Sequence, residues 1–254
     1  MVRSILDATK DAFLGGRLDI WQPRLGYRAG VDPVLLAASV PAKPGQTVLE
    51  LGCGVGVAAL CLATRVDGLT LTGVEMQADY ADLARRNAIE NDLPFDVITA
   101  DLRQLPTGLR QQRFDHVIMN PPYFDQSKGS GSNDGGRNIA LRGETNLSDW
   151  IDIGTRRLAP KGYLTLIQRM ERLPETLSSL TGRLGSLTVR PIAGRSGKAP
   201  DRFLLQARQG GRASFRMTAP LIMHEGAAHL TDSESYRSDV ADSLRNGAAL
   251  PFPA

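Results

Sequence analysis

Three glycines at alternate positions, in the stretch Glu50–Gly56, constrain the fold of this chain more than any other feature. The short apolar segment Thr47–Leu51 leads into them and predicts a buried strand, and the Ala-rich segment Val55–Arg65 predicts a helix directly afterwards. Glycines at such a turn let the backbone approach a ligand without side-chain clash, and the start of the helix leaves N–H groups free. The turn therefore predicts an α/β domain with a ligand site at the end of this strand.

The middle of the chain continues the alternation of strand and helix. Continuous apolar strands separated by helices indicate a parallel sheet with helices on both faces. Later, Ser186–Ile192 and Arg202–Arg208 have no helical pattern between them, so we expect a C-terminal antiparallel hairpin that closes a mostly parallel, seven-stranded sheet. The other expected strands are Leu69–Glu75, Phe95–Thr99, Phe114–Met119 and Tyr163–Ile167; further helices are expected from Asp32 onward and at Gln77–Asn91, Leu147–Leu158, Glu171–Leu180 and Ser233–Arg245.

Length and composition fit one domain with modest additions, since 42% of the 254 residues are hydrophobic. We expect an N-terminal extension at 1–45 that forms part of the wall of the site, a core at 46–210, and a C-terminal extension at 211–254 packed on the core. No apolar run reaches the roughly 18 residues that a membrane span needs, and the start does not resemble a secretory signal. The only cysteines, Cys53 and Cys61, predict a reduced, cytoplasmic protein without a metal site.

The net charge of +3 hides an uneven distribution. Residues 151–216 contain 13 lysines and arginines but only four acidic residues, so this segment carries +9 and the rest of the chain −6. Such asymmetry is typical of proteins with a polyanionic partner such as RNA. A solvated surface rich in arginine is the alternative, and charge alone does not decide between the two.

The spacing of the glycines distinguishes between cofactors. A dinucleotide site would need a glycine where Val57 stands, whereas Gly56 matches the E/D-x-G-x-G-x-G turn of S-adenosylmethionine enzymes. Glu75 ends the second strand, where its carboxylate can accept hydrogen bonds from both ribose hydroxyls, and Asp101 follows the third strand, where it can accept from the adenine amino group. The sequence thus predicts an S-adenosylmethionine site formed by Tyr27, Glu50, Gly52, Gly54, Gly56, Glu75, Met76, Asp101, Leu102 and Asn120.

Two parts of this site have more specific expected roles. Glu50 is expected to brace the turn or to face the methionine ammonium group of the cofactor. Tyr27, Arg28 and Asp32 precede the first core strand, and we expect them to line the methionine end.

The tetrapeptide Asn120-Pro121-Pro122-Tyr123 follows the fourth strand and predicts the chemistry. An amino group conjugated with a π system is a poor nucleophile. If the Asn120 side-chain oxygen and the Pro121 carbonyl accept its two protons, the nitrogen can pyramidalise and direct its lone pair at the sulfonium methyl. The prolines fix the backbone, and Tyr123 can stack on a planar acceptor. We therefore expect Asn120, Pro121 and Tyr123 to be catalytic, and Pro122 and Tyr123 to contact the substrate.

The residues quoted above resemble a known family. Glu50–Gly56, Glu75, Asp101 and Asn120–Tyr123 are similar to those of Rossmann-like class I methyltransferases that modify amino groups. The flanking patterns resemble the bacterial tRNA adenine-N6 methyltransferases that modify the adenosine beside the anticodon of a valine tRNA. These patterns are Phe13–Arg17, Gln22-Pro23, Gly26–Asp32, Leu35–Ala38, Ala199–Arg202 and Pro220–His224. The resemblance implies a tRNA substrate, with Arg137 and Arg142 placed to touch RNA after the Gly/Ser-rich segment Asp125–Gly136, which we expect to be a mobile loop beside the site.

Other acceptors are compatible with the same tetrapeptide. A glutamine side chain in a protein such as a release factor presents the same conjugated NH₂ group, but those enzymes carry an N-terminal helical domain, and too few residues precede the first core strand here. Guanine N2 of ribosomal RNA is a third acceptor that the sequence does not exclude. An RNA-binding relic without activity has no reason to keep both the turn and the tetrapeptide. We expect a monomer or weak dimer.

Overall fold

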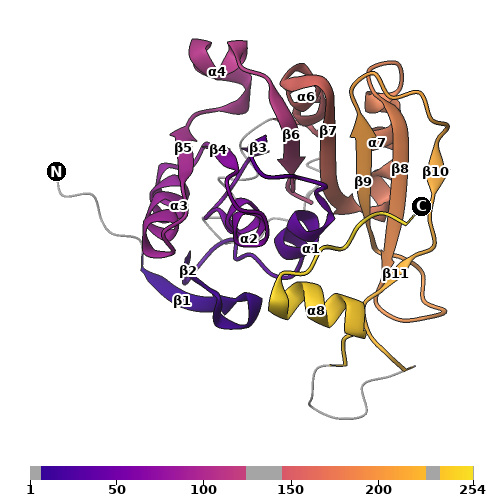
Figure 1. The fold of residues 1–254 in the computed structure, drawn as a ribbon, viewed down its shortest axis with the longest axis horizontal. Helices are drawn as coiled ribbons and strands as arrows, with labels where there is room; N and C mark the ends of the chain where they lie inside the picture. Colours follow the sequence, from indigo (N-terminus) through magenta and orange to yellow (C-terminus); the bar gives the residue numbers. More distant parts are fainter. Residues whose placement is uncertain (1–6, 124–144, 227–234, 254) are drawn as a thin grey trace.

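A computed structural model describes residues 7–123, 145–226 and 235–253 of the chain. A nine-stranded sheet forms its centre (Figure 1). The strands of this sheet are β3 (Thr47–Leu51), β4 (Thr70–Glu75), β5 (Phe95–Thr99), β6 (Phe114–Met119), β7 (Leu158–Arg169), β8 (Gly185–Ala193), β9 (Arg202–Arg208), β10 (Arg216–Met217) and β11 (Leu221–Ile222).

The strand order is β10-β8-β9-β7-β6-β3-β4-β5, with β11 also paired to β8. Strands β3 to β7 run parallel, and β9 is antiparallel to both β7 and β8. The structure thus confirms the mostly parallel α/β sheet and its closing hairpin. The expected number of seven strands omitted β10 and β11, because two residues are too few to leave a recognisable pattern.

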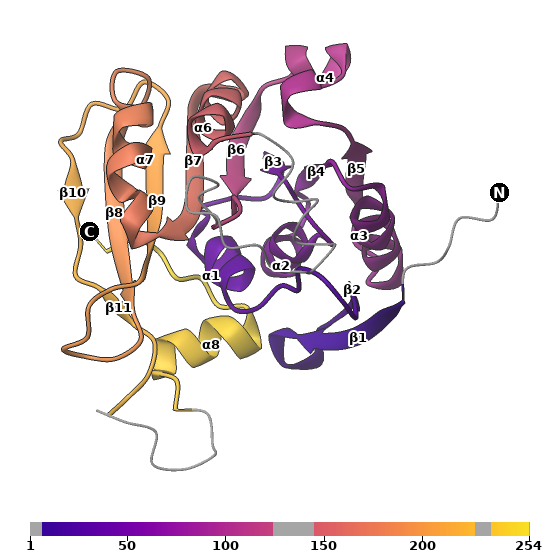
Figure 2. The same ribbon diagram turned by 180° about the vertical axis from the view of Figure 1, so that it is seen from behind.

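Helices cover both faces of the sheet (Figures 1 and 2). Successive strand residues point to opposite faces, so Val48 belongs to one buried apolar cluster and the next residue, Leu49, belongs to the other. The helices are α1 (Asp32–Ser39), α2 (Val57–Arg65), α3 (Ala78–Glu90), α4 (Thr107–Gln111), α6 (Leu147–Arg156), α7 (Leu173–Leu180) and α8 (Ser238–Asn246). Among the described residues, no helix is long and apolar enough to cross a membrane.

A separate hairpin of β1 (Ala8–Phe13) and β2 (Leu18–Pro23) precedes α1. The fully buried Asn87 on α3 anchors it, because its side chain donates to the carbonyl of Trp21 (3.1 Å) and accepts from the Trp21 N–H (2.8 Å). The same amide donates to the carbonyl of Val55 in the glycine turn at 3.0 Å. One buried side chain therefore ties the N-terminal hairpin to the turn.

The helix after the glycine turn begins two residues later than predicted, at Val57. Gly56 has a φ of 90°, in the left-handed region, and this conformation ends the turn before helical geometry begins. The helix expected at Leu147–Leu158 ends at Arg156, because Leu158 already belongs to β7. At the C-terminus, α8 lies beside α1 and the β1–β2 hairpin in both views of the fold.

Candidate active site

The glycine turn and the tetrapeptide meet at one edge of the sheet. Leu51 at the end of β3 lies opposite Met119 at the end of the adjacent parallel strand β6. Gly52 and Asn120, the next residues, therefore leave the sheet at the same level. Glu75 ends β4 on the other side of β3. The carboxyl ends of parallel strands are where open α/β sheets bind ligands, so the fold brings three predicted site residues to that edge.

The turn combines a packed glycine with an open one. A Cβ at Gly52 would overlap the ring of Trp150 on α6. At Gly54 the φ is 55°, and a Cβ there would have no heavy atom within 4 Å. Gly52 is thus needed for packing, while Gly54 faces free space in a conformation that favours glycine. This open backbone beside a helix N-terminus fits a cofactor that approaches the turn closely.

Two buried carboxylates brace the turn. Glu50 accepts a hydrogen bond from the Ala59 N–H in the first turn of α2 (2.9 Å), and Glu75 accepts from the N–H groups of Gly54 (2.9 Å) and Gln77 (2.8 Å). Burial raises the pKa of Glu50 to about 8; the Ala59 hydrogen bond opposes this effect and the nearby Glu75 carboxylate adds to it. Burial also raises the pKa of Glu75. Burial thus favours the uncharged form of both carboxyl groups, and a cation beside them would favour the charged form.

The third acidic residue has a more exposed setting. Asp101 follows β5 and accepts from the Arg103 N–H (2.9 Å) and from its guanidinium (2.8 Å), and these contacts with Arg103 hold the pKa of the Asp101 carboxyl below its usual value. The next residue, Leu102, is buried against the sheet, and Met76 after β4 is 41% exposed. A partly exposed, ionised carboxylate is a suitable acceptor for an amino group, although Arg103 competes for it.

The side chain of Asn120 is held by Tyr27. The amide nitrogen of Asn120 donates to the Tyr27 hydroxyl at 3.4 Å. Tyr27 is fixed in turn by Tyr80, whose hydroxyl accepts from the Tyr27 N–H (2.9 Å) and donates to its carbonyl (3.2 Å). Loss of hydration and the nearby Asp32 and Glu50 carboxylates raise the pKa of Tyr27 to about 12. Because the amide nitrogen of Asn120 donates to Tyr27, the amide oxygen is oriented as a hydrogen-bond acceptor for another group.

The backbone of the tetrapeptide has a buried partner. The carbonyl of Pro121 accepts from the side-chain amide of Gln168 on β7 at 3.2 Å, and the Gln168 oxygen accepts from the Arg169 N–H at 2.8 Å. Gln168 is fully buried. It therefore orients the Pro121 carbonyl and leaves one of its two lone pairs for another donor. Pro122 is exposed.

Tyr123 is anchored at its hydroxyl. This group donates to Asp32 at the start of α1, and Asp32 also accepts from the guanidinium of Arg202 at the start of β9. The guanidinium of Arg169 lies over the Tyr123 ring, 5.6 Å from its centroid. Burial and the Asp32 carboxylate raise the pKa of Tyr123, so its hydroxyl remains a donor at neutral pH. Arg28, the other residue expected at the methionine end, is paired with Asp11 on β1.

Sequence reasoning missed two residues that support the tetrapeptide. Gln168 gives no local motif, and Arg202 lies in the family-like segment Ala199–Arg202, which does not itself indicate a role for this residue. Only the pairing of β7 with β6 and β9 places the two residues near the tetrapeptide. The available signal for Gln168 was a polar residue directly after the mostly apolar run Leu164–Ile167. The residues predicted to touch RNA, Arg137 and Arg142, and the predicted loop Asp125–Gly136 lie outside the described residues.

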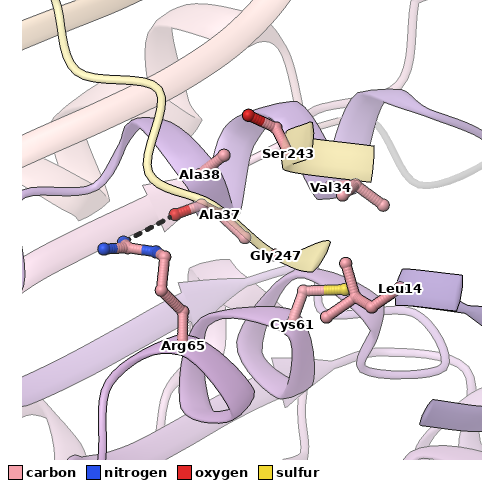
Figure 3. Close-up of a pocket in the computed structure, with 8 residues that line it drawn as sticks. All are labelled: Leu14, Val34, Ala37, Ala38, Cys61, Arg65, Ser243 and Gly247. Carbon is pink, nitrogen blue, oxygen red and sulfur yellow. Dashed lines mark hydrogen bonds between the residues drawn. The ribbon is translucent and has the colours of Figure 1, made fainter. Parts of the chain in front are cut away.

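The small hollow drawn in Figure 3 has no predicted site residue in its lining. It lies between α1, α2 and α8, where Arg65 donates to the carbonyls of Ala37 (3.0 Å) and Val40 (2.6 Å). No group of three side chains suited to a metal occurs in the described parts of the chain. Several arginines of the basic segment 151–216 make internal contacts: Arg172, Arg183 and Arg202 pair with carboxylates, and Arg195 donates to the carbonyl of Glu225.

Comparison with known proteins identifies the family. A tRNA1(Val) (adenine(37)-N6)-methyltransferase from Porphyromonas gingivalis is 32% identical over 231 residues, which cover 86% of this chain and 90% of the relative. The chain belongs to this family. A tRNA1(Val) (adenine(37)-N6)-methyltransferase from Cronobacter sakazakii is 31% identical over 72% of this chain and 75% of its own length. The family model of the methyltransferase small domain matches residues 29–136. These findings confirm the resemblance seen in the sequence.

Solved structures place the fold among methyltransferases. A predicted O-methyltransferase from Agrobacterium tumefaciens superposes with a TM-score of 0.70 and 29% identity, over 88% of this chain and all of the other. A 16S rRNA N2 methyltransferase from T. Thermophilus, in complex with AdoMet and guanosine, gives a TM-score of 0.56 at 20% identity, over 82% of this chain and 52% of the other. The expected methyltransferase fold and enzyme class are confirmed.

Proposed function

We propose that this chain transfers a methyl group from S-adenosylmethionine to the exocyclic N6 amino group of an adenine in tRNA, at the position 37 that its relatives are named for. The observation that carries the proposal is the alignment of Asn120 with the glycine turn. The two motifs leave adjacent parallel strands at the same level, which sets an amide oxygen beside a turn suited to a cofactor. Membership of the family supplies the substrate class.

The residues of the turn and its neighbours would hold the cofactor. Gly54 leaves the backbone open beside the packed Gly52, Glu75 offers carboxylate lone pairs to ribose hydroxyls, and Asp101 offers the same to the adenine amino group. When bound, S-adenosylmethionine supplies an electrophilic methyl group on a cationic sulfur. Glu50 and Glu75 favour that positive charge at the edge of the sheet. We retain Tyr27, Gly56, Met76 and Leu102 as further contacts in this proposal.

The tetrapeptide would prepare the amino group for methylation. The Asn120 oxygen and the Pro121 carbonyl each accept a hydrogen bond from one N–H of the amino group. The nitrogen lone pair therefore turns away from the ring and toward the methyl group. As the nitrogen bonds to the methyl group, the bond between that carbon and the cofactor sulfur would break and leave its electron pair on the sulfur. The positive charge would pass to the nitrogen, where the two oxygens stabilise it. The amine then loses one proton to solvent. No strong base is required, because the nitrogen is acidic once it carries the methyl group.

Tyr123 would supply the stacking surface for the base. Stacking of a base on an aromatic ring is worth about 1–3 kcal/mol. Pro122, Arg137 and Arg142 remain proposed contacts with RNA. A cytoplasmic location, a monomer or weak dimer, and the division into 1–45, 46–210 and 211–254 also remain proposals.

Methyl transfer from labelled S-adenosylmethionine tests the function. The substrates would be unmodified valine tRNA transcripts, the same transcripts with the adenine beside the anticodon replaced by guanine, a release-factor protein and ribosomal RNA. We expect label in the first transcript alone, recovered as 6-methyladenosine after digestion. Label in the release factor would favour glutamine methylation, and label in ribosomal RNA would favour guanine. Equal labelling of both transcripts would contradict the proposed position.

A further inference from the structure

Three segments that are far apart in the sequence converge on the hydroxyl of Tyr123. The hydroxyl donates to one carboxylate oxygen of Asp32, and the guanidinium of Arg202 donates to the other. Tyr123 follows β6, Asp32 begins α1, and Arg202 begins β9. We call these residues the Tyr123 clamp. The proposed chemistry uses the ring of Tyr123 but does not by itself require either partner.

The clamp is largely but not completely shielded from water. The side chains of Asp32 and Arg202 are 15% and 20% exposed. Removing such a pair from water costs free energy that its Coulomb attraction often does not recover, so the pair is a poor device for stability alone. Its geometry is nevertheless well defined, because each carboxylate oxygen accepts from one charged or hydroxyl donor among the described residues. Asp32 is also fixed by its place in the first turn of α1, beside Pro33.

Anchoring the hydroxyl restricts the whole side chain. A tyrosine ring turns about two side-chain bonds, and a hydrogen bond at its far end limits both. Among the described contacts of Tyr123, the only other one at its ring is the guanidinium of Arg169, at 5.6 Å from the centroid. Without Asp32 the ring would sample several rotamers, and an acceptor would have to select the productive one on binding.

We propose that Asp32 and Arg202 are positioning residues that hold the Tyr123 ring in its stacking orientation before the acceptor arrives. This proposal rests on the proposed function, because it assigns a role to Tyr123 in that reaction. Arg202 fixes the carboxylate of Asp32, and Asp32 fixes the ring. The acceptor then meets a ring that is already oriented. This orientation improves the alignment of the amino group and raises the rate of methyl transfer in the bound complex.

A double-mutant cycle tests the coupling. Asp32→Ala and Tyr123→Phe should each lower kcat for tRNA by about tenfold, and the double variant should be no slower than the slower single variant, because both remove the same interaction. The affinity for S-adenosylmethionine and the unfolding midpoint are measured on every variant. If Asp32→Ala does not fold, Asp32→Asn takes its place. Losses that multiply in the double variant would overturn the proposal.

The chain offers a matched control and a conservative replacement. Asp201 also pairs with Arg202, at 3.3 Å, but its side chain is 61% exposed and the structure gives it no contact with Tyr123. Asp201→Asn should therefore leave kcat unchanged. Arg202→Gln should lower kcat, and Arg202→Lys should recover part of the loss. A loss of kcat in Asp201→Asn as large as that in Asp32→Ala would show a general charge effect and overturn the proposal.

A second readout does not depend on the reaction. With 3-fluorotyrosine placed at position 123, the ¹⁹F resonance should lie away from that of the free amino acid in the otherwise unchanged chain. It should move toward the free value in Asp32→Ala and stay in place in Asp201→Asn. If tRNA is not methylated but the resonance behaves as described, the function fails and the clamp stands. If tRNA is methylated but Asp32→Ala leaves the resonance in place, the clamp is refuted and the function stands.

Discussion

The two halves of the site are stabilised in different ways. The cofactor half, which is the turn Gly52–Gly56 with Glu50 and Glu75, is braced by contacts between residues close in sequence: 9 residues separate Glu50 from Ala59, and 21 separate Gly54 from Glu75. The acceptor half, Asn120–Tyr123, is braced by distant residues. Its partners Tyr27, Gln168 and Asp32 are 93, 47 and 91 residues away from the positions that they contact.

This difference determines how strongly each half of the site depends on the rest of the fold. The hydrogen bonds of Glu50 and Glu75 need only β3, α2 and β4, although the turn also contacts Asn87 on α3 and Trp150 on α6. The acceptor half needs α1, β7 and β9 to be in place at once. We therefore expect substitutions in α1, β7 and β9 to damage methyl transfer without damaging cofactor binding. Substitutions in these elements that damage cofactor binding alone should be rare.

The strongest test of this separation is Asn120→Ala. Loss of an acceptor that stabilises developing charge should lower kcat by at least about a hundredfold. Cofactor affinity should stay within about twofold, because Asn120 is not among the groups that brace the turn. Transfer rates come from labelled S-adenosylmethionine and affinity from calorimetry. Equal losses in rate and affinity would mean that the two halves are not separable, and normal turnover would refute the mechanism.

The reverse separation is tested at Gly54. A Cβ there would enter the open space before the turn, so Gly54→Ala should weaken cofactor binding by about tenfold, while kcat at saturating cofactor changes little. Gly45→Ala is the matched control, since Gly45 also has a positive φ, 82°, and open surroundings. Both variants should lose about 1 kcal/mol of stability through left-handed strain. The prediction fails if Gly45→Ala weakens cofactor binding as much as Gly54→Ala.

A smaller effect is expected at Gln168, which supports the acceptor half from a buried position. Gln168→Met keeps the volume but removes the donor to the Pro121 carbonyl, so that carbonyl can turn away from the amino group. We expect kcat to fall by about fivefold to tenfold, with KM for tRNA and cofactor affinity nearly unchanged. Thr165 on the same strand is equally buried, and Thr165→Val serves as the control for disturbance of β7. A rise in KM at constant kcat would point to substrate binding instead.

The same contrast explains what the sequence could predict. Strands β5, β6 and β9 have the bounds expected for them, because their apolar runs are short and sharply ended. The residues of the cofactor half follow from one local motif. The β1–β2 hairpin has no such signal: it mixes polar and apolar residues and depends on Asn87, which lies far along the chain. Gln168 and Arg202 were missed for the same reason, since only strand order brings them to the tetrapeptide.

The smallest effect is expected from the charge of Glu50 in the cofactor half. With a pKa of about 8, Glu50 is largely protonated at pH 7 in the folded chain, whereas an unfolded glutamic acid titrates near 4.5. A raised folded-state pKa means that this group stabilises the fold below pH 4.5 and that its contribution is lost as the pH rises through 8.

Cofactor binding should shift the same equilibrium. A cation at the turn favours the carboxylate form of Glu50, so binding should release part of a proton at pH 7, and cofactor affinity should rise several-fold from pH 6.5 to 8.5. Calorimetry in buffers of different ionisation enthalpy measures the released proton. Glu50→Gln keeps the acceptor for the Ala59 N–H but does not titrate, so its affinity should be nearly flat over this range. If cofactor affinity in the unaltered chain is equally independent of pH, the charge of the cofactor does not interact with Glu50, and this carboxyl group only braces the turn.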